Sequence, residues 1–327
     1  MTIRLLSSFS PARFASTALL TTLAALAGCA DVALEGTAEE GDDIALASIE
    51  QGLVSHVPSA FTMANAYNGT SLFGSSCSSS SKMDLVGHEP ATAGKFPVAV
   101  WLTGTLADFK GDGALAFTAS MAARGFVAAT VEYANSTYPS CGAMKTKASC
   151  VFDASSSNSA IAKLCARAKA DCSKGIVVAG ISQGANLASL SKNYDARVKG
   201  AYLLSNVVAP SFYNNSACLS DAATKLAKNE VRIISAESDE FEGSVSKVRS
   251  ALHTATGYKC TGYDCLQADG SGWYIVSDAQ VQDGKADHCY LLNGGCSGTT
   301  ADKGYETSSA VWAGVPNVDW LASRISR

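Results

Sequence analysis

The chain has 327 residues, of which 47% are hydrophobic and 17% are charged, and its formal net charge at pH 7 is −4. This apolar content is too high, and this charge too low, for a disordered chain, so the sequence predicts a folded globular protein. The chain has no block of Lys and Arg and no net positive charge, which argues against nucleic acid as a partner.

The first 28 residues have the pattern of an export signal. Two arginines precede an apolar stretch, 14–27, that is too short to span a bilayer stably. The stretch runs into LAGC at 26–29, which resembles the bacterial lipoprotein box, and this resemblance implies that Cys29 is lipidated. The alternative is an ordinary signal peptide cleaved after residue 27. We therefore expect an exported protein of the bacterial cell envelope, held to the periplasmic face or the cell surface by its lipid anchor alone.

The segment 29–52 is predicted to be an acidic tether. Residues 30–52 contain seven Asp and Glu and neither Lys nor Arg, and like charges keep such a segment extended. The remainder, 53–327, is predicted to be one domain because its strand-like and helix-like segments alternate without a break.

The alternation within that domain predicts the fold class. Strands are expected at 82–86, 96–102, 126–133, 176–180, 198–205, 231–235 and 273–277. Helices are expected at 113–124, 159–170, 185–192, 222–228, 244–256 and 318–325. Apolar, β-branched strands alternating with amphipathic helices predict an α/β fold, in which helices cover both faces of a mostly parallel central sheet.

The stretch VVAGISQGANLASL, 177–190, places Ser182 between Gly180 and Gly184 where a predicted strand meets a predicted helix. A serine exposed at such a turn has a strained backbone, and only very small side chains fit two residues before and after it. Because Gly-x-Ser-x-Gly also arises by chance, its position between a strand and a helix is what makes Ser182 a candidate nucleophile.

With this motif at this place, the chain resembles the α/β-hydrolase family over most of residues 82–327, and its Ser-Gln-Gly is similar to that of cutinases. The resemblance implies an α/β-hydrolase fold and a catalytic Ser, acid and His in that order along the chain. His288 follows the last predicted strand, and it is the only one of the four histidines at the position that the family uses.

The acid is expected after the strand 231–235. Asp239 lies four residues beyond that strand, where the family places its acid. Glu240 is the principal rival, and Glu237 and Glu242 also compete. A solvated acidic loop without a catalytic role is the alternative interpretation of this segment.

Two backbone N–H groups are expected to stabilise an oxyanion. The first belongs to Gln183, the residue after the nucleophile. The second is assigned to Thr105, in the loop after the strand 96–102. The family often has His-Gly in this loop, whereas this chain has Thr-Gly-Thr at 103–105, so the loop departs from the family's pattern at the histidine.

The cysteines predict disulfides rather than a metal site. The chain has eleven, and ten remain once Cys29 is set aside, an even number that fits an oxidising compartment. Close spacing suggests the pairs Cys141–Cys150, Cys260–Cys265 and Cys289–Cys296, and the other four cysteines are left unassigned. No Cys-x-x-Cys or His-x-His cluster occurs, so we expect neither a metal nor a cofactor.

These residues together predict a serine esterase that cleaves carboxylic esters through an acyl-enzyme. Only about 22 residues separate the strand ending near Val208 from the next one at Val231, so no large lid is expected. An open site suits bulky or polymeric esters. The alternatives are a lipid-anchored binding or surface protein on a degenerate hydrolase fold, and an acyltransferase with the same triad.

Overall fold

The computed structural model describes residues 55–71, 76–210, 214–288, 304–305 and 308–326. The predicted signal segment 1–28, the tether 29–52 with Cys29, and the pair Cys289–Cys296 lie outside the described residues. No helix in the described part of the chain is long and apolar enough to cross a membrane.

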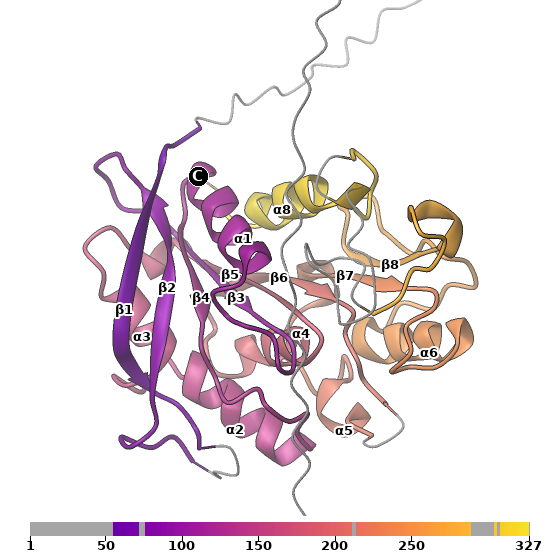
Figure 1. The fold of residues 1–327 in the computed structure, drawn as a ribbon, viewed down its shortest axis with the longest axis horizontal. Coiled ribbons are helices and arrows are strands. Elements are labelled where there is room, and N and C mark those ends of the chain that lie inside the picture. Colours follow the sequence, from indigo (N-terminus) through magenta and orange to yellow (C-terminus); the bar gives the residue numbers. More distant parts are fainter. Residues whose placement is uncertain (1–54, 72–75, 211–213, 289–303, 306–307, 327) are drawn as a thin grey trace, which may run out of the picture. The chain divides into compact units, whose positions relative to one another are not determined.

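Eight strands form one sheet in the order β1-β2-β4-β3-β5-β6-β7-β8 (Figure 1). Strand β2 is antiparallel to both of its neighbours, and every other adjacent pair is parallel. The predicted mostly parallel sheet is therefore confirmed. The strands are β1 Pro58–Asn68, β2 Lys82–Pro90, β3 Val98–Leu102, β4 Val127–Val131, β5 Ile176–Ile181, β6 Val198–Leu204, β7 Val231–Ala236 and β8 Gly272–Val276.

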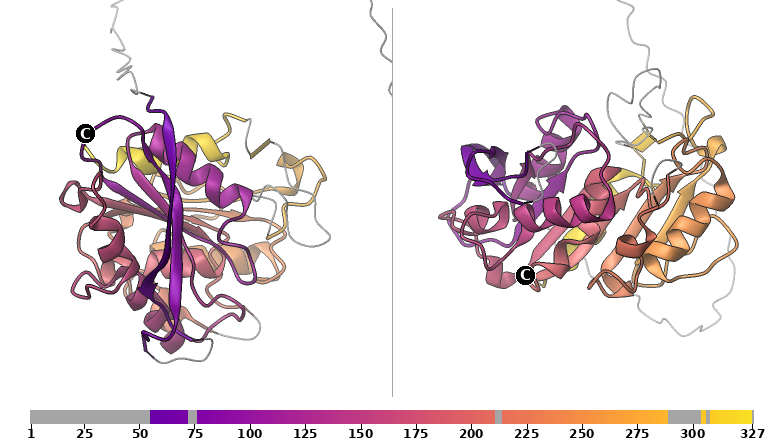
Figure 2. Two further views of the ribbon diagram at one scale, coloured as in Figure 1. Left: turned by 60° about the vertical axis from the view of Figure 1, so that its left-hand side comes forward. Right: turned by 90° about the horizontal axis from the view of Figure 1, so that it is seen from below.

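Helices cover both faces of this sheet, with α1 and α8 on one face and the remaining helices on the other (Figures 1 and 2). The described α-helices are α1 Asp112–Ala123, α2 Cys141–Phe152, α3 Ala160–Cys165, α4 Gln183–Ser189, α5 Ser216–Leu219, α6 Val245–Thr256 and α8 Gly314–Ser323. Strand β3 shows how the two cores form. Val98 and Val100 face the core beneath α2 and α4, whereas Ala99 and Trp101 face the core beneath α1 and α8.

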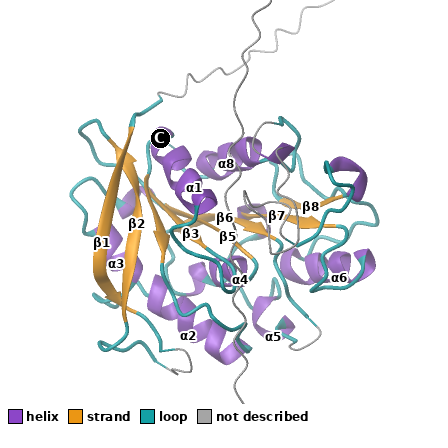
Figure 3. Cartoon of the chain, in the orientation of Figure 1, coloured by secondary structure: helices purple, strands orange, loops and turns teal. Residues whose placement is uncertain are grey.

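Three elements, β1, α2 and the short α5, were not predicted, and one predicted helix is absent. Strand β1 is largely exposed, so it carries no continuous apolar run, and its pairing with β2 holds it in place. Helix α2 was not predicted either. The helix predicted at 222–228 is wrong: that segment forms turns leading into the single 3₁₀ turn Lys228–Glu230, and the nearest helix is the short α5 (Figure 3).

Four disulfides join cysteines of the described chain: Cys77–Cys150, Cys141–Cys218, Cys165–Cys172 and Cys260–Cys265. The last pair agrees with the spacing argument, and the predicted pair Cys141–Cys150 is wrong. Both cysteines of that pair lie on α2, and nine residues of helix separate them by about 13 Å, whereas disulfide Cα atoms lie within about 7 Å.

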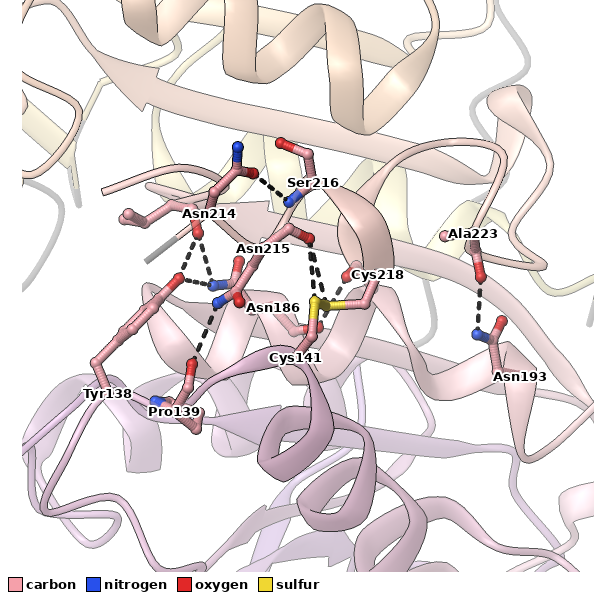
Figure 4. The surroundings of a disulfide bond; sticks show 12 residues. Tyr138, Pro139, Cys141, Asn186, Asn193, Asn214, Asn215, Ser216, Cys218 and Ala223 are labelled. Carbon is pink, nitrogen blue, oxygen red and sulfur yellow. Dashed lines mark hydrogen bonds between the residues drawn. A yellow bond between two sulfur atoms is a disulfide. The ribbon is translucent and has the colours of Figure 1, made fainter. Parts of the chain in front are cut away.

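The two disulfides of α2 attach this helix to distant segments. A disulfide joins Cys141 to Cys218 of α5. Asn215 lies beside this disulfide, and its Nδ2 donates to the Pro139 carbonyl at 3.2 Å (Figure 4). Cys150 binds Cys77, which precedes β2. Helix α2 is therefore fixed covalently near both of its ends, and disulfides of this number are typical of an exported protein.

The strand order reverses between β3 and β5. The chain passes from β3 to β4 on one side, returns to β5 on the other side of β3, and then continues outward through β6, β7 and β8. In open α/β sheets the loops at the carboxyl ends of the two strands flanking such a reversal diverge, and ligands bind there. The loop after β3 and the turn after β5 are those two segments.

Candidate active site

Ser182 lies in a strained turn between β5 and α4. Its φ of 55° and ψ of −124° are rare for a residue with a side chain. Backbone hydrogen bonds hold the turn on both sides: the Ser182 N–H donates to the Leu204 carbonyl at 2.9 Å, and the Asn186 N–H donates to the Ser182 carbonyl at 3.1 Å. The sheet and the helix therefore impose this conformation together.

The glycines around Ser182 are required by close approach of the backbone. A Cβ on Gly184 would lie 2.2 Å from the Leu102 carbonyl oxygen, and a Cβ on Gly180 would lie 2.6 Å from the Gly184 carbonyl carbon. Gly104 faces the serine, since a Cβ there would lie 3.2 Å from the Ser182 Cβ. The turn after β5 thus packs directly against the loop after β3.

Asp239 and His288 form a buried pair. The Asp239 Oδ2 and His288 Nδ1 are 2.7 Å apart, and the residues are 1% and 3% exposed. Asp239 follows β7, and its other oxygen accepts the Phe241 N–H at 3.0 Å. The Phe241 ring contacts the imidazole edge-on, with centroids 4.5 Å apart. The imidazole is therefore held from two directions.

The competing carboxylates have other partners. Glu240 accepts the backbone N–H of His288 at 3.1 Å, and Glu242 accepts the Val208 N–H at 2.7 Å. Glu237 accepts the Tyr263 hydroxyl and the backbone N–H of Asp278. Of the four acids considered, Asp239 is the one that contacts the imidazole.

The charge environment favours protonation of His288. Burial by itself lowers the pKa of the imidazole, but the charge and hydrogen bond of Asp239, together with the charges of Glu240 and Asp287, outweigh that effect and raise the pKa above its ordinary value. A histidine with this balance is a stronger base than a free imidazole.

Ser205 connects the serine turn to the histidine. It follows Leu204, the residue that accepts the Ser182 N–H, and its hydroxyl donates to the His288 carbonyl at 3.2 Å. The His288 Nε2 is buried and has no hydrogen-bond partner among the described residues, Ser182 Oγ included. Such hydrogen bonds are often long before a substrate binds. No pattern in the sequence indicates the bridging role of Ser205.

The two residues assigned as oxyanion donors touch each other. The Gln183 side chain is fully buried, and its Nε2 donates to the Thr105 Oγ1 at 2.8 Å. As the first residue of α4, Gln183 has no acceptor for its backbone N–H within the helix. The loop that carries Thr105 is held by Asn135, whose Nδ2 donates to the carbonyls of Gly104 and Ala107, both at 2.8 Å.

The other three histidines serve local structure. His88 contacts the Thr118 hydroxyl, His56 the Thr92 hydroxyl, and His253 the Cys260 carbonyl. In the part of the chain that the structure describes, no group of three or more His, Cys, Asp or Glu could hold a metal ion.

No protein-family model and no curated protein matches this chain. The geometry of the site therefore carries the functional argument.

Proposed function

We propose that the chain adopts an α/β-hydrolase fold and is a serine hydrolase that cleaves carboxylic esters through an acyl-enzyme. The observation that carries this proposal is the buried Asp239–His288 pair, 2.7 Å apart, at the same sheet edge as the strained Ser182 turn. Strain of this kind persists where the surrounding structure imposes it, and it is concentrated at functional sites.

The reaction follows from the chemistry of these groups. Ser182 Oγ attacks the ester carbonyl carbon while His288 Nε2 takes the hydroxyl proton, and the proton then passes to the departing alcohol. Water attacks the acyl-enzyme by the same route and releases the acid. Asp239 accepts from Nδ1, which fixes the tautomer with a free Nε2 lone pair and stabilises the imidazolium.

The oxyanion would accept the backbone N–H groups of Gln183 and Thr105. These groups come from the turn after β5 and the loop after β3, which pack together at Gly104. Preorganised amides of this kind are worth about 3 kcal/mol of transition-state stabilisation each. This arrangement needs no histidine in the loop after β3, because the donors are backbone groups.

Bulky or polymeric esters are the proposed substrate class. In the connection from β6 to β7, the described residues form only the four-residue helix α5 and turns, which supports a site without a large lid. Export and lipid anchoring through Cys29 complete the proposal, since an enzyme acting on large esters must meet them outside the cytoplasm.

Labelling with a fluorophosphonate tests the proposal without a choice of substrate. The mature protein should be modified once, at Ser182, as shown by intact mass and peptide mapping. S182A should not be labelled although its circular dichroism is unchanged, and S250A, which removes an exposed hydroxyl on α6, should be labelled as the wild type is.

Absence of labelling in a folded wild-type protein would contradict an activated serine. A binding or surface protein on a hydrolase fold would then be the better interpretation. Label found on a serine other than Ser182 would reject the assignment of the turn after β5.

A further inference from the structure

Lys147 on α2 is a buried cation without an acidic partner. The residue is 4% exposed, and its Nζ donates to the Gln183 Oε1 at 3.2 Å. Among the described residues no carboxylate lies within ion-pairing distance of this Nζ. Lysines are almost never fully buried unless they are paired, because desolvation of the ammonium is costly. A lysine directed at a neutral amide is therefore an unusual arrangement.

The Lys147 ammonium and the Thr137 carbonyl require the same orientation of the Gln183 amide. An ammonium has only donors, so the group that faces it must be the amide oxygen. The amide nitrogen then points the opposite way, where it donates to the Thr105 Oγ1 at 2.8 Å and to the Thr137 carbonyl at 3.0 Å. Burial lowers the pKa of Lys147 to about 8, so the side chain remains mostly protonated at pH 7.

The chain of contacts ends at both proposed oxyanion donors. Gln183 supplies one backbone N–H and Thr105 the other, and the side-chain hydrogen bond between the two residues fixes the distance between their backbones. Rotation of the Gln183 amide by half a turn would place its oxygen against the Thr137 carbonyl and would leave the ammonium without an acceptor. Lys147 therefore stabilises one of the two amide orientations.

We propose that Lys147 is a positioning residue for the oxyanion hole. It acts through the Gln183 side chain to hold the backbone N–H groups of Thr105 and Gln183 in the relative position that an oxyanion needs. This inference rests on the proposed function. It assigns a role to a buried side chain that would act through Gln183 and not by contact with the substrate.

A purely structural role for Lys147 is a weaker account. Helix α2 packs through apolar residues such as Met144, Ala148 and Val151, which are buried. Disulfides through Cys141 and Cys150 hold the same helix near both ends. The fold of α2 thus has ample support without the Lys147 amine.

The substitution K147M keeps the length of the side chain and removes its donors. With p-nitrophenyl acetate, kcat should fall about 10- to 100-fold while KM changes less than about twofold, because the contact acts on the transition state. The rate of fluorophosphonate labelling at Ser182 should fall in parallel. K145M, on the exposed side of the same helix, should behave as the wild type does.

A double-mutant cycle separates positioning from packing. T105V removes the Oγ1 that accepts from Gln183, and it should lower kcat as K147M does. The kcat of the double variant should lie within about threefold of the kcat of the less active single variant, because both substitutions break the same chain of contacts. T105S returns a hydroxyl, so its kcat should be at least about tenfold higher than that of T105V.

Several results would overturn the inference. K147M with the wild-type kcat, a change confined to KM, or fully additive effects of K147M and T105V would each do so while Ser182 labelling of the wild type kept the proposed function intact. A wild type that neither turns over esters nor labels at Ser182 would reject both.

Discussion

At the scale of single residues, the protonation of His288 controls the proposed reaction. Only the neutral imidazole can accept the Ser182 proton, and the net effect of Asp239, Glu240 and Asp287 is to raise the pKa of His288 against the opposing effect of burial. Ester hydrolysis should therefore be lost as the pH falls, with a midpoint above the pKa of a free imidazole.

The substitution D239N should move this acidic limb to lower pH. Removal of the carboxylate leaves burial as the dominant influence, and burial lowers the pKa of His288. The rate itself should fall by about two to four orders of magnitude, because the amide no longer fixes the tautomer or stabilises the imidazolium. The pH dependence of kcat/KM from about pH 5 to about pH 9 measures both effects.

E237Q is the matched control for D239N. Glu237 lies in the same loop and contacts Tyr263 and the backbone of Asp278, so its substitution should leave the acidic limb in place. An acidic limb that stays fixed, or rises, in D239N would contradict the assignment of Asp239 as the partner of the base.

At the scale of elements, the turn between β5 and α4 depends on glycine. G184A would place a methyl group 2.2 Å from the Leu102 carbonyl oxygen and 2.4 Å from that of Thr103. Neither backbone atom can move aside without displacing β3 or its loop. We expect the free energy of unfolding to fall by about 2–3 kcal/mol, measured by denaturant titration, with loss of Ser182 labelling.

G142A provides the comparison for G184A. Gly142 is an exposed residue of α2 with nothing within 4 Å of the position that a Cβ would occupy. Alanine there should be neutral or stabilising by up to about 1 kcal/mol. If G184A were as well tolerated as G142A, the packing of the turn against β3 would be wrong.

The elements that the sequence predicted are those with a continuous local pattern. Strands β3, β5, β6 and β7 are buried throughout their length, apart from Lys199 in β6, and their mostly apolar runs are visible in the sequence. Strand β1 and helix α2 lack such a pattern. The first depends on pairing with β2, and the second is held in place by its disulfides as well as by its packing. Neither kind of contact is visible within a short window of sequence.

At the scale of the molecule, the disulfides differ in how much chain they close. Cys77–Cys150 and Cys141–Cys218 span 73 and 77 residues, whereas Cys260–Cys265 spans five. Loop-closure entropy predicts a larger contribution to stability from the long-range pairs, about 4 kcal/mol each against about 2 kcal/mol for the short one.

We therefore expect C141A/C218A to lower the unfolding midpoint more than C260A/C265A does. Thermal unfolding followed by circular dichroism measures the difference, and thiol titration of the unfolded variants checks that the remaining pairs are intact. Equal loss in the two variants would contradict the entropic account.

The sequence by itself determined the alternation of strands and helices, the turn at Ser182 between a strand and a helix, and the order in which Asp239 and His288 follow it. Each of these depends only on a few consecutive residues or on their order along the chain. The tertiary structure decided which of four acids contacts His288, how Cys141 and Cys150 are paired, and that Lys147 is directed at Gln183. Those outcomes depend on distances between side chains that lie 36 to 77 residues apart in the chain, and only packing of the whole sheet and its helices sets such distances.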